Sequence, residues 1–145
     1  MNEATCKAAL CRLLRESVIP KGGIVYRHED TFTGGIPDIS VNLDGRTVWA
    51  EVKLDKPGRK GKLTALQQAA LTALYGLEVH YALDKERVLS CRVTDYRTGA
   101  VLAHVRSGPK TVHRIIRDAL LARLACSCGA PLTPGRCSSN CERDE

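Results

Sequence analysis

The sequence predicts an α/β domain in which helices flank a β-sheet, followed by a short cysteine-rich tail. Segments with apolar residues at helical spacing occur along the chain together with segments in which apolar and polar residues alternate. Such a mixture of helical and strand patterns is typical of a layered α/β domain. An Asp-Gly pair between two strand patterns also indicates a tight β-hairpin. We expect the domain to cover residues 1–125 and the tail to cover residues 126–145.

Length and composition limit the classes of protein to be considered. The 145 residues suffice for one domain with a small appendage, and a hydrophobic content of 43% suffices for a packed core. The formal net charge of +6 favours a polyanionic partner, although basic charge can also serve solubility alone. No apolar run follows the first residues and no stretch reaches transmembrane length, so we expect a cytosolic protein without a membrane partner.

The first helix is predicted over residues 3–17, where apolar residues recur at helical spacing before Pro20. Glu3 and Glu16 are the acidic residues of this helix. The helix dipole stabilises a carboxylate at the N-terminus, so Glu3 has a purely structural explanation. Residues 24–28 then alternate as a short strand.

Residues 34–53 form the β-hairpin around which the chain is organised. Apolar and polar residues alternate on both sides of the Asp-Gly turn, and a two-residue loop places Leu43 opposite Arg46. The same register places Asp38 opposite Glu51 on one face of the sheet, with Cβ atoms roughly 4.5–5.5 Å apart.

Lys53 shares that face, because it follows Glu51 by two residues in the strand. Two facing carboxylates repel each other, and a bound divalent cation relieves this repulsion. Oxygen ligands suit magnesium or manganese. The alternative is a hairpin end whose charges are simply solvated.

A basic loop follows the hairpin. Pro57 and two glycines exclude a helix there. The loop carries the densest positive charge of the chain, on Lys56, Arg59, Lys60 and Lys62. A cationic loop at this end of the hairpin suits a nucleic-acid phosphate backbone, and an exposed linker is the alternative.

The next helix is predicted over residues 64–75. Thr64 and Gln67 have the spacing of a capping box, in which each side chain satisfies the other's backbone amide. The buried stripe of this helix is expected at Leu66, Ala70, Ala73, Leu74 and Leu77. Alternation then predicts strands over residues 78–83, 87–93 and 100–105, and helical spacing predicts a last helix from residue 110 or 111 to 125.

The tail differs in kind from the domain. Its four cysteines are Cys126, Cys128, Cys137 and Cys141. A segment so short and polar has too little apolar content for a core, and the spacing indicates one structural zinc site with four thiolate ligands. Four thiolates leave no open coordination position for catalysis. Free thiols or an adventitious disulfide are the alternative.

Four short motifs follow one another along the domain. They are Gly35-Ile36-Pro37-Asp38, Glu51-Val52-Lys53, the basic loop from Lys56 to Lys62, and Thr64-Ala65-Leu66-Gln67. In this order they resemble the PD-(D/E)xK nuclease superfamily, and within it the VRR-type (virus-type replication-repair) nuclease domains. The resemblance covers about the first two-thirds of the chain, and four short motifs in register are more specific than any one of them.

The resemblance implies a restriction-endonuclease-like fold, which is a mixed β-sheet flanked by helices, and a site that hydrolyses phosphodiester bonds. The catalytic residues that it implies are Asp38, Glu51, Lys53 and Gln67. The ligands that it implies for Mg²⁺ or Mn²⁺ are Asp38, Glu51, the Val52 carbonyl and a glutamate of the N-terminal helix. For that glutamate, Glu3 matches the expected distance from the Pro-Asp strand better than Glu16 does.

We therefore expect a metal-dependent nuclease that acts on DNA, with structured or branched DNA of replication, recombination or repair as one class of substrate. Two alternatives stay open: a nucleic-acid-binding module that does not cleave, and an adaptor whose zinc-binding tail docks a replication or recombination protein. A homodimer is also left open. By resemblance, the expected setting is the cytosol of a bacterium or of a phage-infected host.

Overall fold

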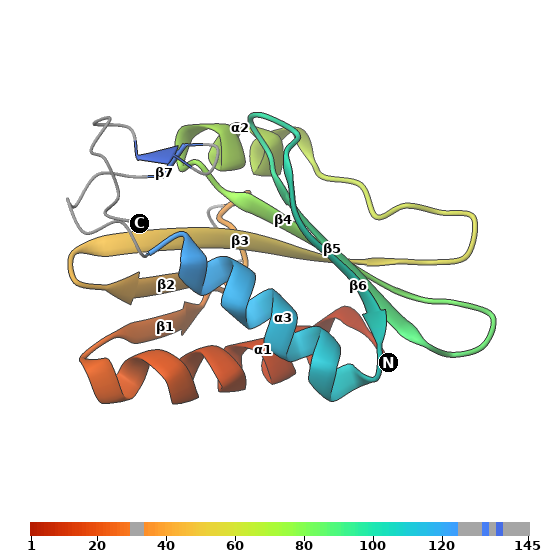
Figure 1. Cartoon of the computed structure of the whole chain (residues 1–145). Coiled ribbons are helices and arrows are strands. Elements are labelled where there is room, and N and C mark those ends of the chain that lie inside the picture. Colours follow the sequence, from red (N-terminus) through yellow and green to blue (C-terminus); the bar gives the residue numbers. More distant parts are fainter. Residues whose placement is uncertain (30–33, 125–131, 134–135, 138–145) are drawn as a thin grey trace.

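A six-stranded mixed β-sheet forms the centre of the computed structural model, which describes residues 1–29, 34–124, 132–133 and 136–137 (Figure 1). The strands lie in sequence order and are β1 (Ile24–Arg27), β2 (Ile39–Leu43), β3 (Arg46–Asp55), β4 (Leu77–Leu83), β5 (Leu89–Asp95) and β6 (Val101–Ser107). Within this sheet β3 and β4 are parallel, and the other neighbouring pairs are antiparallel. The predicted mixed α/β class is thus confirmed.

The helices are α1 (Glu3–Val18), α2 (Ala65–Ala73) and α3 (Pro109–Ala122), and a short 3₁₀ turn (Ile19–Lys21) follows α1. Figure 1 shows α1 and α3 along one side of the sheet, in contact with each other, and α2 on the opposite side. The segment that contains α2 joins the parallel strands β3 and β4, which need a crossover connection. Within the described residues, no helix is both long and apolar enough to cross a membrane.

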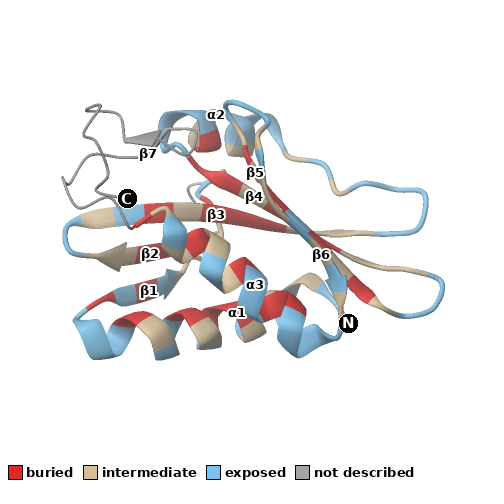
Figure 2. Cartoon of the chain, in the orientation of Figure 1, coloured by how far each residue is buried: buried red, intermediate tan, exposed pale blue. Residues whose placement is uncertain are grey.

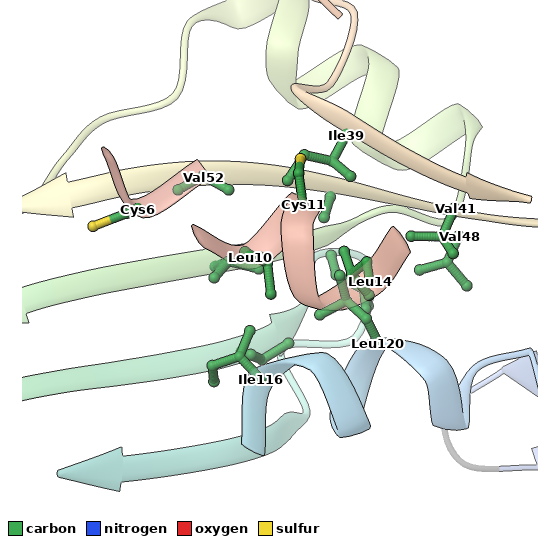
Figure 3. Packing of buried hydrophobic residues seen from close by; sticks show 14 of the residues in the cluster. Cys6, Leu10, Cys11, Leu14, Ile39, Val41, Val48, Val52, Ile116 and Leu120 are labelled. Atoms are coloured by element: carbon green, nitrogen blue, oxygen red, sulfur yellow. The ribbon is translucent and has the colours of Figure 1, made fainter. Parts of the chain in front are cut away.

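The hydrophobic core lies between the sheet and the helices α1 and α3 (Figures 2 and 3). Helix α1 contributes Cys6, Leu10, Cys11, Leu14 and Val18, and α3 contributes Val112, Ile116 and Leu120. The alternating apolar residues of β2 and β3 meet them from the sheet, namely Ile39, Val41, Val48, Ala50 and Val52. The polar residues of the same strands therefore face the other side of the sheet, which we call the polar face.

The hairpin has the predicted register. Leu43 pairs with Arg46, and the pairing continues to Ile39 opposite Ala50. Asp44 and Gly45 both have positive φ angles, 53° and 74°, as the turn between two twisted antiparallel strands requires.

The expected buried stripe of α2 is wrong for Leu66, Ala73 and Leu74, whereas Leu77 is buried but belongs to β4. Leu66 is 63% exposed and Leu74 is 37% exposed, whereas Leu71 is fully buried. Leu71 packs closely against Gly76, where an added Cβ would lie 2.4 Å from the leucine side chain. Because Leu71 packs here, the face of α2 that carries Gln67 and Leu71, which are one helical turn apart, is directed toward the sheet.

The structure describes little of the tail. Two short strands, β7 (Leu132–Thr133) and β8 (Arg136–Cys137), pair antiparallel. Cys126, Cys128 and Cys141 lie outside the described residues, and for Cys137 only the backbone is described. The predicted zinc site stays a prediction.

Candidate active site

The site begins where β3 extends beyond its neighbour β2. Because β2 starts at Ile39, opposite Ala50, the β2 side of β3 has no strand partner after that residue. Two carboxylates accept hydrogen bonds from the backbone N–H groups of β3 that have no strand partner on this side. Asp38 Oδ2 accepts a hydrogen bond from the Val52 N–H at 2.9 Å, and Glu3 Oε1 accepts one from the Leu54 N–H at 3.3 Å. The exposed edge of β3 is thus lined by acidic side chains from α1 and from the start of β2.

Glu51 lies directly beside Asp38 and is buried. One of its carboxylate oxygens, Oε2, accepts a hydrogen bond from the Asp38 backbone N–H at 3.1 Å. The other, Oε1, accepts one from Gln67 Nε2 at 2.8 Å and lies 3.6 Å from Lys53 Nζ. Burial and the neighbouring Asp38 carboxylate raise the pKa of Glu51 to about 7, against the opposing effect of Lys53.

Gln67 has two functions at once. Its Oε1 accepts a hydrogen bond from the Thr64 N–H at 2.9 Å, which completes the predicted capping box, while its Nε2 holds Glu51. The cap fixes the side chain at the first turn of α2, so the orientation of Glu51 depends on where this helix begins.

Lys7 also belongs to the site, although the sequence motifs do not include it. Its Nζ donates a hydrogen bond to Asp38 Oδ1 at 2.9 Å. Lys7 follows Glu3 by four residues on α1, and both side chains reach the end of β3 from the same helix face. The four-residue spacing of Glu3 and Lys7 is visible in the sequence. It indicates a site residue only when α1 is known to pack against the end of β3.

The structure brings some of the predicted site residues together and leaves others apart. Asp38, Lys53 and Gln67 all lie within hydrogen-bond or ion-pair distance of Glu51, and Glu3 accepts a hydrogen bond from Leu54 on the same strand end. Glu16 lies near the other end of α1 and is exposed. The four basic residues of the loop are exposed and, within the described part of the chain, make no ion pair.

A second polar cluster continues the site across the polar face. In the parallel pair β3–β4, Glu51 lies beside Glu78 and Lys53 lies beside His80. His80 Nδ1 is 2.9 Å from Asp55 Oδ1, and its Nε2 is 3.5 Å from Glu78 Oε1. The hydrogen bond with Glu78 raises the pKa of His80, and Asp55 raises it further, whereas burial acts in the opposite direction. The same hydrogen bond lowers the pKa of Glu78.

This cluster borders a hollow of about 480 Å³ that is lined by Asp55, Lys60, Glu78, His80, Arg92 and His104, among others. The sequence motifs do not include His80. Its environment depends on the pairing of β3 with β4, which local patterns do not encode.

The donor set at the end of β3 fits a hard divalent cation. Among the described residues no group of three or more His, Cys, Asp or Glu side chains is arranged to hold a metal. Asp38 and Glu51 nevertheless supply two adjacent carboxylates, and the Val52 carbonyl belongs to the same strand end. Mg²⁺ commonly binds through one or two carboxylates and keeps several waters. The Lys7 ammonium balances the charge of Asp38, and the raised pKa of Glu51 reflects its burial beside a second carboxylate.

No protein-family model matches this chain, and no curated protein sequence matches it.

Proposed function

We propose that this chain is a metal-dependent nuclease of the PD-(D/E)xK type, related to the VRR-type domains, that hydrolyses phosphodiester bonds in DNA. The observation that supports the proposal most is the meeting of Asp38, Glu51, Lys53 and Gln67 at the end of β3. These residues come from three separate segments, and they are the ones that the sequence motifs singled out. The mixed sheet with helices on both sides is compatible with a restriction-endonuclease-like fold.

Each residue has a chemical role in the proposed reaction. Mg²⁺ or Mn²⁺, when bound, supplies charge neutralisation at phosphorus and lowers the pKa of a bound water. Asp38, Glu51 and the Val52 carbonyl would hold the cation, and Gln67 holds Glu51 in place. Lys53, 3.6 Å from Glu51, orients the attacking water or stabilises negative charge on the phosphate oxygens.

The two remaining residues from α1 have supporting roles. Glu3 is held by the Leu54 amide close to the end of β3 and completes the acidic edge of the site. Lys7 lies 2.9 Å from Asp38 and balances its charge, so a cation held by Asp38 would compete with this ammonium for the carboxylate.

A panel of DNA substrates tests the proposal. Purified protein with Mg²⁺ is offered linear, nicked, flapped and four-way DNA, and Asp38→Asn protein from the same purification is the control. We expect cleavage of at least one substrate, which stops when the metal is chelated and is absent from the variant. Binding without any product, with either Mg²⁺ or Mn²⁺, would instead indicate a nucleic-acid-binding module that does not cleave.

The basic loop is expected to bind DNA phosphates. Replacing Lys56, Arg59, Lys60 and Lys62 with alanine should weaken binding and reduce the slope of log K against log salt. The reduction on duplex DNA is about 0.9 for each lost phosphate contact. Lys21→Ala is the matched control, because Lys21 is exposed at the end of the turn after α1. A slope equal to that of the wild type would mean that the loop points away from the substrate.

The tail is expected to carry one zinc ion on Cys126, Cys128, Cys137 and Cys141. Residues 126–145 contain one large apolar side chain, Leu132, so burial cannot offset an ordering entropy of roughly 1–2 kcal/mol per residue. Elemental analysis of protein grown with zinc should find one equivalent, and the Cys137→Ser variant should lose it. A metal-free preparation with four titratable tail thiols would refute the site. The adaptor alternative predicts that deletion of the tail abolishes binding to a replication or recombination protein and leaves cleavage intact.

A further inference from the structure

Three rings lie together on the polar face of the sheet. Tyr26 belongs to β1, His28 follows that strand, and Trp49 belongs to β3. The rings of His28 and Trp49 are stacked, with centroids 5.2 Å apart and planes at 27°. The ring of Tyr26 lies 6.0 Å from that of His28. We call these three residues the aromatic platform.

The platform adjoins the Asp38–Glu51 site. Trp49 precedes Glu51 by two residues in β3, so both side chains point to the polar face, about 7 Å apart along the strand. The pairing of Tyr26 with Ser40 and of Ser40 with Trp49 places the tyrosine in the same row across three strands.

The platform is held in place but is not part of the core. His28 Nε2 lies 2.8 Å from Ser40 Oγ, and Ser40 is buried, so the imidazole orientation is fixed. Tyr26 is nevertheless 53% exposed. The chain has only six Phe, Trp and Tyr residues, since it contains one Phe, one Trp and four Tyr. Among the aromatic residues that the structure describes, Tyr26 and Trp49 lie on the polar face rather than in the core between the sheet and α1 and α3.

Charged residues follow the platform along β3. Going along β3, the order is Trp49, then Glu51 and Lys53, then the basic loop that starts at Lys56. A polyanion that contacts the loop and passes Glu51 would reach the platform next. Aromatic rings and cationic side chains along one path together bind single-stranded nucleic acid, because bases stack on rings while cations contact phosphates. Here the platform and the basic loop lie on opposite sides of Glu51 along β3.

We propose that the aromatic platform stacks an unpaired base of a single-stranded DNA segment that passes the Asp38–Glu51 site. The proposal rests on the proposed nuclease function for the chemistry of the neighbouring site, and it adds the class of substrate. Bases inside a duplex are already stacked on both sides, so a protein ring finds a free base face only in single strands, loops, flaps or ends. The preferred substrate is therefore DNA with a single-stranded segment rather than a continuous duplex.

Trp49 makes a direct test feasible, because it is the only tryptophan of the chain. Its fluorescence is recorded while single-stranded oligothymidylate is added in the presence of a chelator, so that no cleavage occurs. A blunt duplex of equal length is the comparison. We expect saturable quenching by the single strand and little by the duplex. Equal responses to both, or none to the single strand, would overturn the proposal.

Variants of Tyr26 test the contribution of the exposed ring. Tyr26→Ala should weaken binding of the single strand by about 5- to 150-fold, the range expected for one stacked base, and should leave duplex binding unchanged. Tyr26→Phe keeps the ring and should bind as the wild type does. Tyr75→Ala is the matched control, because Tyr75 is 46% exposed and its ring contacts Arg97 instead of the platform. Unchanged affinity in Tyr26→Ala would also overturn the proposal.

These binding experiments can fail or succeed independently of the cleavage assay. Quenching by single strands, without cleavage of any DNA in Mg²⁺, would support the platform and refute the nuclease. Cleavage that requires Asp38, without selective quenching, would support the nuclease and refute the platform.

Discussion

Replacing Glu51 with glutamine should abolish cleavage and, at the same time, stabilise the metal-free protein above neutral pH. The loss of activity follows because a neutral amide cannot supply the negative oxygen that holds the cation, whose electrostatic contribution is several kcal/mol, or about a thousandfold or more in rate. DNA binding should survive, since the phosphate contacts come from the basic loop. Initial rates of cleavage and DNA affinity in chelator are the two measurements.

The gain in stability follows from the buried carboxylate. The folded-state pKa of Glu51, about 7, lies above its ordinary value of 4.5, so the folded protein holds a proton that the unfolded chain releases. Wild-type stability therefore falls as pH rises from about 4.5 through 7, whereas the glutamine variant has no such penalty. We expect the free energy of unfolding of Glu51→Gln to exceed that of the wild type by about 1–3 kcal/mol near pH 8, and by much less near pH 5.

Urea denaturation in chelator at the two pH values measures this difference. Glu16→Gln is the matched control, because Glu16 is exposed near the far end of α1 and should change stability by less than about 0.5 kcal/mol. A variant that is less stable than the wild type at both pH values would show that Glu51 is a structural ion-pair partner and not one of two crowded carboxylates.

Replacing Lys53 with alanine should lower the rate of cleavage by about 10²- to 10⁴-fold, which is the usual contribution of a group that moves or positions a proton. Metal binding should persist, because an ammonium is not a ligand. Lys21→Ala controls for the loss of one positive charge. A variant with wild-type kcat and a raised KM would identify Lys53 as a phosphate-binding residue without a part in activating water.

Much of the site could be predicted because a short turn determines it. A two-residue Asp-Gly loop sets the register of β2 and β3, and the register places Asp38 against Glu51 and the apolar residues in the core. The capping box of Thr64 and Gln67 is equally local. These features depend on neighbours within a few residues or across one turn.

Other features depend on long-range packing and could not be predicted. The bond from Lys7 to Asp38 requires that α1 docks against the end of β3, and the cluster around His80 requires the parallel pairing of β3 with β4. The stripe of α2 was wrong for a further reason. Most leucines and alanines of this helix, including the exposed Leu66, lie on one side, so periodicity favoured that side over the one that carries the buried Leu71.

The aromatic platform could not be foreseen as a unit either. Tyr26, His28 and Trp49 come from segments whose proximity is visible only once β1, β2 and β3 are aligned. Singly, each looks like an ordinary strand or loop residue. Because they lie next to Asp38 and Glu51, base stacking on them can be tested as part of substrate binding.

Binding of Mn²⁺ to the metal-free site tests the proposed metal centre most directly, because it does not depend on finding the right substrate. Calorimetric titration near pH 8 is carried out on zinc-replete wild type and on Asp38→Asn, Glu51→Gln, Lys53→Ala and Glu16→Gln proteins. We expect binding by the wild type, by Lys53→Ala and by Glu16→Gln, and a loss of about tenfold or more in affinity for each of the two carboxylate variants. Wild-type affinity in Asp38→Asn and Glu51→Gln, or no binding by the wild type, would contradict a metal centre on these two carboxylates.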